Sequence, residues 1–256
     1  MLLLIDIGNT RIKWARADAR GLTEQAAAVH AHWTEQDFVQ QVLDSAPRAQ
    51  RVLIANVGGK RIGDLAQAAL LRHWQIEPRF MQSPAAACGL RNAYSEPANL
   101  GVDRWLAMLG GRSLEPGPIC VVSVGTAMTI DGVDAGGRHL GGVIVPGPDL
   151  MVSSLLKNTS EIAQRAAQRA DMSRTQAQLF ADNTLGAIQQ GAVHALAALV
   201  ERTLETMQAQ LGKAPALLIT GGASATLRGA IRVPGREIPD LVLRGLLVAA
   251  AEPESP

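Results

Sequence analysis

Short apolar runs that end in polar, glycine-containing turns recur along the chain. Four of them occupy residues 2–5, 52–56, 119–124 and 217–220. Runs of this length that are bounded by turn residues are typical of buried β-strands. A fifth segment, residues 12–17, follows the first run across a short polar turn, which predicts a second strand beside it.

Longer segments with apolar residues at helical spacing alternate with these runs. They cover residues 62–74, 100–112, 183–211 and 241–250. The third is the longest: Asp182 or Asn183 can cap its start, and Gly212 can end it. Residues 134–138 predict a hairpin turn between two further strands. Strands that alternate with helices indicate an α/β fold.

The two halves of the chain resemble each other. Residues 2–10 are an apolar strand followed by Asp-x-Gly-Asn-Thr, and residues 119–127 are an apolar strand followed by Ser-x-Gly-Thr-Ala. Asp6 and Ser123 take the same place in the two segments, nearly half the chain length apart. Repetition at this spacing predicts two similar α/β lobes, residues 1–115 and 116–256, with a cleft between them.

Composition gives no electrostatic reason to expect a nucleic-acid or membrane partner. The chain has 256 residues, of which 47% are hydrophobic and 18% charged, and its formal net charge is +1. These values are typical of a globular protein. The sequence has no helix-turn-helix pattern and no apolar run near the roughly 18 residues of a membrane span. We therefore expect no nucleic acid and no membrane as partners.

The cysteines and the N-terminus predict a cytoplasmic protein. Cys88 and Cys120 lie among small or apolar residues, which favours buried thiols in a reducing compartment over a disulfide. The N-terminal apolar run has no basic residue before it and is too short for a signal peptide.

An acidic residue, Asp6, stands at the end of the first apolar run. A carboxylate in a buried strand is unfavourable unless a cation or hydrogen-bond donors meet it. One interpretation is a structural aspartate that caps the turn at Gly8-Asn9. The other is a loop that binds phosphate and metal, because glycine lets backbone N–H groups approach an anion and Mg²⁺ prefers oxygen ligands.

Three further features fit phosphate chemistry, and each has a plain structural alternative. Lys13 could contact phosphates or be an exposed strand lysine. The Gly221-Gly222 turn could let an adenine or ribose lie against the backbone, or be an ordinary tight turn. Asp103, in the segment GVDRW, could take a proton from a substrate hydroxyl or cap a helix. Arg104 beside it could bind a carboxylate or phosphate through two hydrogen bonds.

Motifs along nearly the whole chain, taken in order, resemble those of the type III pantothenate kinases. They are IDIGNT (5–10), LGVDRW (100–105), SVGTAMTID (123–131), LGGVIVPG (140–147), DNTLGAIQQG (182–191) and TGG (220–222). The resemblance implies an α/β fold of duplicated actin-like (ribonuclease H-like) lobes with an ATP cleft between them. It also implies a homodimer that uses ATP to phosphorylate pantothenate to 4'-phosphopantothenate, the first committed step of coenzyme A biosynthesis.

The resemblance assigns roles to individual residues. In the first loop it implies contacts with ATP, and with Mg²⁺ at the first position, for Asp6, Ile7, Gly8, Asn9, Thr10, Arg11, Ile12 and Lys13. Further ATP contacts are implied for Gly125, Thr126, Gly221 and Gly222. Asp103 would be the general base. The pantothenate pocket would be formed by Tyr94, Gly101, Val102, Asp103, Arg104 and Thr184. Without the resemblance, surface packing and helix capping are the better explanations of Tyr94 and Thr184.

One position departs from the family pattern. The family commonly has Asp-x-Gly-Thr in the second loop, where the aspartate helps to bind a monovalent cation such as K⁺ or NH₄⁺. Here that position is Ser123. Because a hydroxyl is a weaker cation ligand than a carboxylate, we predict a weaker or altered dependence on the monovalent cation.

Two other functions are compatible with parts of the sequence. One is another kinase or phosphatase of the same superfold, such as an exopolyphosphatase or a sugar or acetyl-group kinase; the GVDR and DNT motifs argue against it. The other is a binding or regulatory protein, since some relatives were first described as accessory factors for virulence-gene transcription. The combination of Asp6, Asp103 and Thr126 favours catalysis, because a pure interaction module has no need of it.

Overall fold

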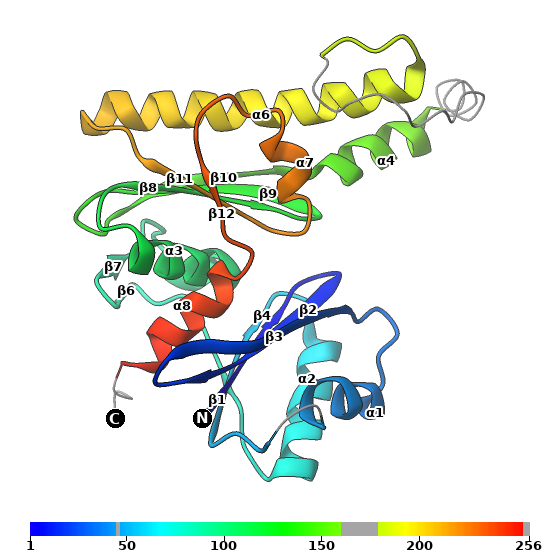
Figure 1. Ribbon diagram of the computed structural model, residues 1–256, viewed down its shortest axis with the longest axis vertical. Coiled ribbons are helices and arrows are strands. Elements are labelled where there is room, and N and C mark those ends of the chain that lie inside the picture. Colours follow the sequence, from blue (N-terminus) through cyan, green and yellow to red (C-terminus); the bar gives the residue numbers. More distant parts are fainter. Residues whose placement is uncertain (45–46, 160–178, 253–256) are drawn as a thin grey trace. The chain divides into compact units, whose positions relative to one another are not determined.

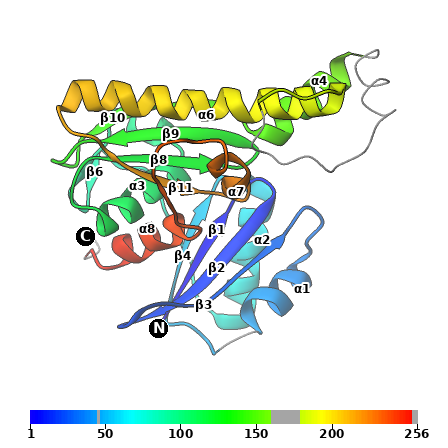
Figure 2. The same ribbon diagram turned by 45° about the horizontal axis from the view of Figure 1, so that its top comes forward.

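The computed structural model describes residues 1–44, 47–159 and 179–252. The chain folds into two compact units, each containing a five-stranded mixed sheet (Figures 1 and 2). Unit 1 comprises Met1–Pro116, Gly136–His139 and Asp240–Pro256, and unit 2 comprises Gly117–Ala135 and Leu140–Pro239. The expected α/β class is confirmed.

The sheet of unit 1 has the strand order β3-β2-β1-β4-β5. Its strands are β1 (Leu2–Ile7), β2 (Arg11–Asp18), β3 (Gly21–Val29), β4 (Arg51–Asn56) and β5 (Arg79–Phe80). The first three strands form an antiparallel meander, and β4 and β5 continue the sheet in parallel with β1. A separate two-stranded ribbon pairs β6 (Ala86–Ala87) with β7 (Leu90–Arg91).

The sheet of unit 2 repeats this arrangement with the order β10-β9-β8-β11-β12. Its strands are β8 (Ile119–Val124), β9 (Ala127–Val133), β10 (His139–Pro146), β11 (Ala216–Thr220) and β12 (Arg236–Glu237). Strand β8 is antiparallel to β9 and parallel to β11, as β1 is to β2 and β4.

The strand register supports the repeat seen in the sequence. Asp6 is the penultimate residue of β1 and pairs with Lys13 on β2. Ser123 is the penultimate residue of β8 and pairs with Thr129 on β9. The two halves therefore have the same topology, and Asp6 and Ser123 occupy equivalent positions in it.

The helices of unit 1 lie on both faces of its sheet (Figure 1). They are α1 (Glu35–Phe38), which continues as the π-helical η1 (Val39–Leu43), α2 (Lys60–Ala69), which continues as the π-helical η2 (Leu70–Trp74), the 3₁₀ turn η3 (Pro97–Asn99), α3 (Val102–Leu114) and α8 (Leu241–Ala250). The helix predicted over residues 62–74 is thus present, and its last five residues are π-helical instead of α-helical.

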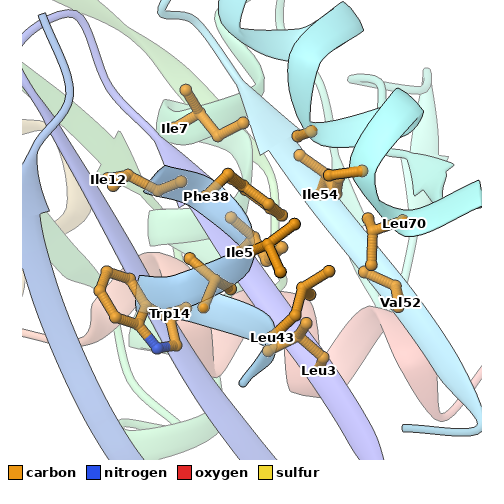
Figure 3. Packing of buried hydrophobic residues seen from close by; sticks show 14 of the residues in the cluster. Leu3, Ile5, Ile7, Ile12, Trp14, Phe38, Leu43, Val52, Ile54 and Leu70 are labelled. Carbon is orange, nitrogen blue, oxygen red and sulfur yellow. The ribbon is translucent and has the colours of Figure 1, made fainter. Parts of the chain in front are cut away.

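One face of β1 forms the core beneath α1 and α2. Figure 3 shows the alternate residues Leu3, Ile5 and Ile7 directed toward this face, because successive side chains of a strand point to opposite sides. The other large side chains of the same cluster come from β2, β4 and the helices. They include Ile12, Trp14, Phe38, Leu43, Val52, Ile54 and Leu70, which Figure 3 labels.

Helix α8 packs with α3 and with the opposite face of the sheet of unit 1. A Cβ atom at Gly245 would lie 1.9 Å from the carbonyl oxygen of Leu106, so the backbones of the two helices touch. The division expected from the sequence, between residues 115 and 116, lies next to the main boundary between the units. Residues 136–139 and the segment from Asp240, expected in the second lobe, pack with unit 1.

The sheet of unit 2 is covered by a long helix, α6 (Thr184–Leu211), beside α4 (Pro148–Asn158) and α7 (Ser224–Arg228) (Figure 2). The side-chain oxygen of Asn183 caps α6 by accepting from the backbone N–H of Gly186 at 2.8 Å. Gly212 ends the helix in the left-handed conformation with φ 67°. Both predicted helix ends are confirmed.

Among the described residues, no helix has the length and hydrophobicity to cross a membrane.

Candidate active site

The first loop joins β1 to β2 through residues 8–10. The backbone N–H of Gly8 donates to the carbonyl of Arg11 at 2.9 Å and closes the turn. The end of β4 approaches this turn closely, because the N–H groups of Val57 and Gly58 both donate to the carbonyl of Ile7, at 2.9 and 3.0 Å. Asn9 and Thr10 stay exposed at the tip. The loop therefore presents backbone and small polar side chains to solvent at the end of the central strand.

Asp6 lies within β1, opposite Lys13 on β2, and not in the turn itself. The residue keeps some exposed surface, yet desolvation of its carboxyl raises the pKa from 3.8 to about 7. The positive charge of Lys13 lowers this pKa in part, and the negative charge of Asp103 raises it further. The fold thus brings Asp6, Lys13 and Asp103 into one electrostatic group.

Asp103 lies in the first turn of α3. Gly101 occupies the N-cap position and Asp103 the second helical position, so Asp103 is not the cap residue of this helix. A Cβ atom at Gly101 would lie 2.7 Å from Oδ1 of Asp103. The carboxylate is therefore folded back over the helix N-terminus, where a negative charge is favourable.

Tyr94 and Arg104 are in direct contact in unit 1. Nη1 of Arg104 donates to the Tyr94 hydroxyl at 3.0 Å, and its guanidinium carbon lies 5.8 Å from the centre of the tyrosine ring. Arg104 is 5% exposed, so its side chain is oriented by this contact and by the surrounding protein. Two of the predicted pantothenate residues are therefore arranged as a pair, and one of them, Arg104, follows Asp103 directly in the sequence.

His139, which no sequence pattern indicates, stacks on Tyr94. The two rings lie 6.2 Å apart with an angle of 13° between their planes, and Nδ1 of His139 accepts from the N–H of Ala93 at 3.4 Å. His139 is fully buried. A single histidine after a turn gives no sequence signal for such a contact.

A hairpin tip brings His139 to this place. The N–H of Arg91 donates to the carbonyl of Gly137 at 2.9 Å, which ties the tip to the β6–β7 ribbon. Gly137 has φ +78°, and a Cβ atom there would lie 2.0 Å from the carbonyl oxygen of Gly89. Only glycine fits that position, for both reasons. The turn predicted over residues 134–138 is present, and it positions His139 against Tyr94.

The second loop, in unit 2, joins β8 to β9. The N–H of Gly125 donates to the carbonyl of Ala127 at 3.0 Å, and the carbonyl of Thr126 accepts from the N–H of Gly147 at 2.8 Å. Thr126 is exposed, and Ser123 behind it is half-buried. The loop has the same place in its sheet as the first loop, as the repeat predicts.

The turn after β11 passes close to β8. Gly221 has φ +101°, and a Cβ atom there would lie 2.2 Å from the carbonyl oxygen of Val124. Gly222 has open space around its α-carbon. The glycine pair therefore does more than reverse the chain, because Gly221 permits a close approach to the second loop. Thr184 is the first residue of α6 and is half-buried; Asn183, one residue earlier, is the cap.

A second histidine that no sequence pattern indicates, His30, lies against the first loop. Its Nε2 is 2.7 Å from the carbonyl oxygen of Gly8, and the residue is 3% exposed. It follows a strand whose exposed alanines and polar residues give no apolar alternation.

The chain is similar to known proteins along nearly its whole length. The sequence pattern of the type III pantothenate kinases matches residues 2–206. A type III pantothenate kinase from Nitrosococcus oceani is 35% identical over 257 aligned residues, covering 98% of this chain and 94% of the relative. One from Azoarcus sp. (strain BH72) is 38% identical, covering 98% of this chain and 91% of the relative.

The chain belongs to the type III pantothenate kinase family. The resemblance found in the sequence motifs is thereby confirmed.

The fold is also the one expected of a type III pantothenate kinase, with two similar α/β halves. A solved structure described as a 2-dehydro-3-deoxygalactonokinase from Sinorhizobium meliloti matches with a TM-score of 0.60 at 14% identity, covering 98% of both chains. One described as a Baf family transcriptional activator from Campylobacter jejuni matches with a TM-score of 0.57 at 22% identity, covering 96% of this chain and 95% of that one. At these identities the likeness concerns the actin-like fold alone.

Proposed function

We propose that this chain transfers the γ-phosphate of ATP to the primary hydroxyl of pantothenate, giving 4'-phosphopantothenate for coenzyme A biosynthesis. Family membership supports the activity. The structural observation that supports it best is the group formed by Asp6, Lys13 and Asp103. It places a desolvated carboxylate behind a glycine loop, together with a lysine and a second carboxylate at a helix N-terminus.

The proposed mechanism is mainly positioning and charge neutralisation, as in other phosphoryl transfers. Backbone N–H groups of the first and second loops would bind phosphate oxygens, helped by the hydroxyls of Thr10 and Thr126. Asp103 would accept the proton of the attacking hydroxyl. Arg104, which is oriented by its hydrogen bond to Tyr94, would bind the pantothenate carboxylate or position the residues that bind it.

We propose that Asp6 holds Mg²⁺, directly or through water. Within the described ranges, the structure gathers no group of three or more histidine, cysteine or acidic side chains. Such a group is unnecessary for Mg²⁺ in a kinase, since the ion keeps several waters and binds substrate phosphates. The raised pKa of Asp6 supports this role, because a bound cation would stabilise the charged form of the carboxyl. When bound, the ion would neutralise charge on the transferring phosphates.

The monovalent cation requirement is proposed to be weaker than in the family at large. Ser123 is the structural equivalent of Asp6 in unit 2, and its neighbours across the sheet are Thr129 and Thr220. Hydroxyls and carbonyls at this position supply dipoles and no formal negative charge. A steep, saturable activation by K⁺ would count against this proposal.

We propose that the enzyme is a homodimer formed through unit 2. Strand β10 is an edge strand of its sheet. This strand and the segments near it expose large apolar side chains. These are Val143, Ile144, Leu150, Leu155, Leu179 and Phe180. Exposed apolar side chains that lie close together support an association surface here. Sedimentation of the wild type and of Ile144→Lys tests this: the wild type is expected to be dimeric and the variant monomeric. Leu71→Lys, a substitution of an exposed leucine in unit 1, is the control and leaves the mass unchanged.

A cytoplasmic location fits the thiols. Cys88 and Cys120 are both free in the structure, and burial raises the pKa of Cys120 to about 12. Such a thiol is protonated and unreactive at neutral pH, as in a structural core. Fractionation of cells that produce the tagged protein would test the location.

The activity is tested by ADP release from Mg²⁺-ATP with and without pantothenate, in K⁺ and in Na⁺ buffer, with the phosphorylated product identified by mass. Pantothenate-dependent release is expected. Asp103→Asn should lower turnover by about 10²–10⁴-fold with a smaller effect on ATP affinity. No release with pantothenate would refute the proposed function, and near wild-type turnover of the variant would remove Asp103 from the mechanism.

A further inference from the structure

His30 holds the first loop at two points. Its backbone N–H donates to the carbonyl of Thr10 at 3.3 Å, and its imidazole Nε2 lies 2.7 Å from the carbonyl oxygen of Gly8. A carbonyl oxygen only accepts, so the proton of the neutral ring is on Nε2. Nδ1 is buried with no hydrogen-bond partner among the described residues. Among the described residues, the ring therefore makes one hydrogen bond, and its partner is the loop.

These two contacts orient two peptide groups of the loop. In a trans peptide, the C=O of one residue and the N–H of the next point in opposite directions. Because His30 draws the carbonyls of Gly8 and Thr10 toward itself, the N–H groups of Asn9 and Arg11 are directed away from it. A loop that binds phosphate needs this arrangement, with amide hydrogens presented and carbonyl oxygens withdrawn.

The equivalent position in unit 2 shows that the imidazole is not a requirement of the fold. There, Gly147 follows β10 as His30 follows β3, and its N–H donates to the carbonyl of Thr126 at 2.8 Å. A Cβ atom at Gly147 would lie 2.0 Å from the carbonyl oxygen of Gly125. In unit 2 the backbone itself occupies that space. In unit 1, the unit with Asp6 and Lys13, a hydrogen-bonding side chain fills it.

The segment that contains His30 is anchored from the start of α2. Arg61 donates to the backbone carbonyls of His30, Ala31 and Trp33, at 3.3, 3.2 and 3.1 Å. The donor that reaches Gly8 therefore comes from a fixed backbone, which is the condition for one side chain to orient another part of the chain.

We propose that His30 is a positioning residue for the first phosphate loop and that its Nε2–H contributes to ATP affinity. The proposal rests on the proposed function of this loop in nucleotide binding. Loss of the donor leaves the Gly8 carbonyl free to rotate toward the phosphates. The expected effect is roughly a 5–20-fold rise in the KM for ATP, the size that one hydrogen bond commonly gives. The KM for pantothenate should change less than about twofold.

The test compares three substitutions that differ in where they place an N–H group. His30→Gln puts an amide N–H near the position of Nε2, His30→Asn puts it near Nδ1, and His30→Leu provides none. His32→Leu replaces an exposed histidine two residues away and serves as the control. For each variant, we would measure Tm, both KM values, kcat, and the Kd of a non-hydrolysable ATP analogue by calorimetry.

The expected order of ATP affinity is wild type and His32→Leu, then His30→Gln, then His30→Asn and His30→Leu together. The proposal is overturned if the glutamine variant binds the analogue no better than the leucine variant. The proposal is also overturned if the His30 variants raise the KM for ATP and the KM for pantothenate equally, and the rise follows a fall in Tm. If the wild type binds the analogue without phosphorylating pantothenate, the proposed function fails, while the order of Kd values still decides the role of His30. No binding to the wild type overturns both.

Discussion

The carboxyl of Asp6 is expected to destabilise the metal-free protein at neutral and alkaline pH. Its pKa is 3.8 in the unfolded chain and about 7 in the folded one, so the folded state binds this proton more tightly. The stability that this proton contributes is complete below pH 3.8 and is lost as the pH rises through 7. A difference of about 3 pKa units sets an upper limit near 4 kcal/mol for the loss. Because the residue keeps some exposed surface, we expect on the order of 2–4 kcal/mol.

Asp6→Asn removes the charge and keeps the size of the side chain. In EDTA, we expect the variant to exceed the wild type in free energy of unfolding at pH 8. The advantage should shrink by roughly 1–3 kcal/mol at pH 5, where the wild-type carboxyl is protonated in the folded state. In thermal unfolding, the gain at pH 8 corresponds to roughly 5–10 °C in Tm. The same variant should lose kinase activity, because the proposed Mg²⁺ ligand is gone.

Asp18→Asn is the matched control on the neighbouring strand. Hydrogen bonds from the backbone and side chain of Arg20 lower the pKa of Asp18, so its neutralisation should not stabilise the protein at pH 8. A destabilising charge on Asp6 is refuted if Asp6→Asn is no more stable than the wild type at pH 8. It is also refuted if the stability difference is the same at pH 5 and pH 8.

Three further substitutions have expected outcomes that follow from single contacts. Gly101→Ala should fold normally, since the backbone at Gly101 has φ −54°. The variant should have a kcat lowered by about 10-fold or more, because the new methyl group would lie 2.7 Å from Oδ1 of Asp103 and displace that carboxylate. Unchanged kinetics would contradict this. Gly245→Ala places a methyl group 1.9 Å from the Leu106 carbonyl oxygen and should lower the free energy of unfolding by about 3 kcal/mol or more, measured in urea, because the contact is with backbone. His139→Ala should raise the KM for pantothenate several-fold more than the KM for ATP, because the stacked tyrosine loses its support; equal changes in both would argue for a general loss of structure.

Much of the fold could be predicted from local patterns. The strand at residues 119–124 and both ends of α6 agree with the structure, because apolar runs and cap residues act over a few neighbours. Strand β3 was not predicted. It is an edge strand of alanines and polar residues, and its hydrogen bonds to β2 form it without an apolar pattern.

Parts of the candidate site could be predicted, and parts could not. The motif from Asp6 to Lys13 stands in the sequence as glycine and polar residues after a strand, which is a local arrangement. The contacts of His30 with Gly8 and of His139 with Tyr94 join residues that no spacing rule connects. Their partners are chosen by the packing of whole strands and hairpins.

The sequence by itself determined many of the elements, the repeat and the family, since periodicity, turn residues and motif order are properties of the chain alone. Only the tertiary structure decided that α8 belongs with unit 1, through the backbone contact of Gly245 with Leu106. It also decided that Asp6 would share its electrostatic surroundings with Asp103, nearly a hundred residues later. Such pairings depend on close packing between distant segments, and that packing exists only once the whole unit has folded.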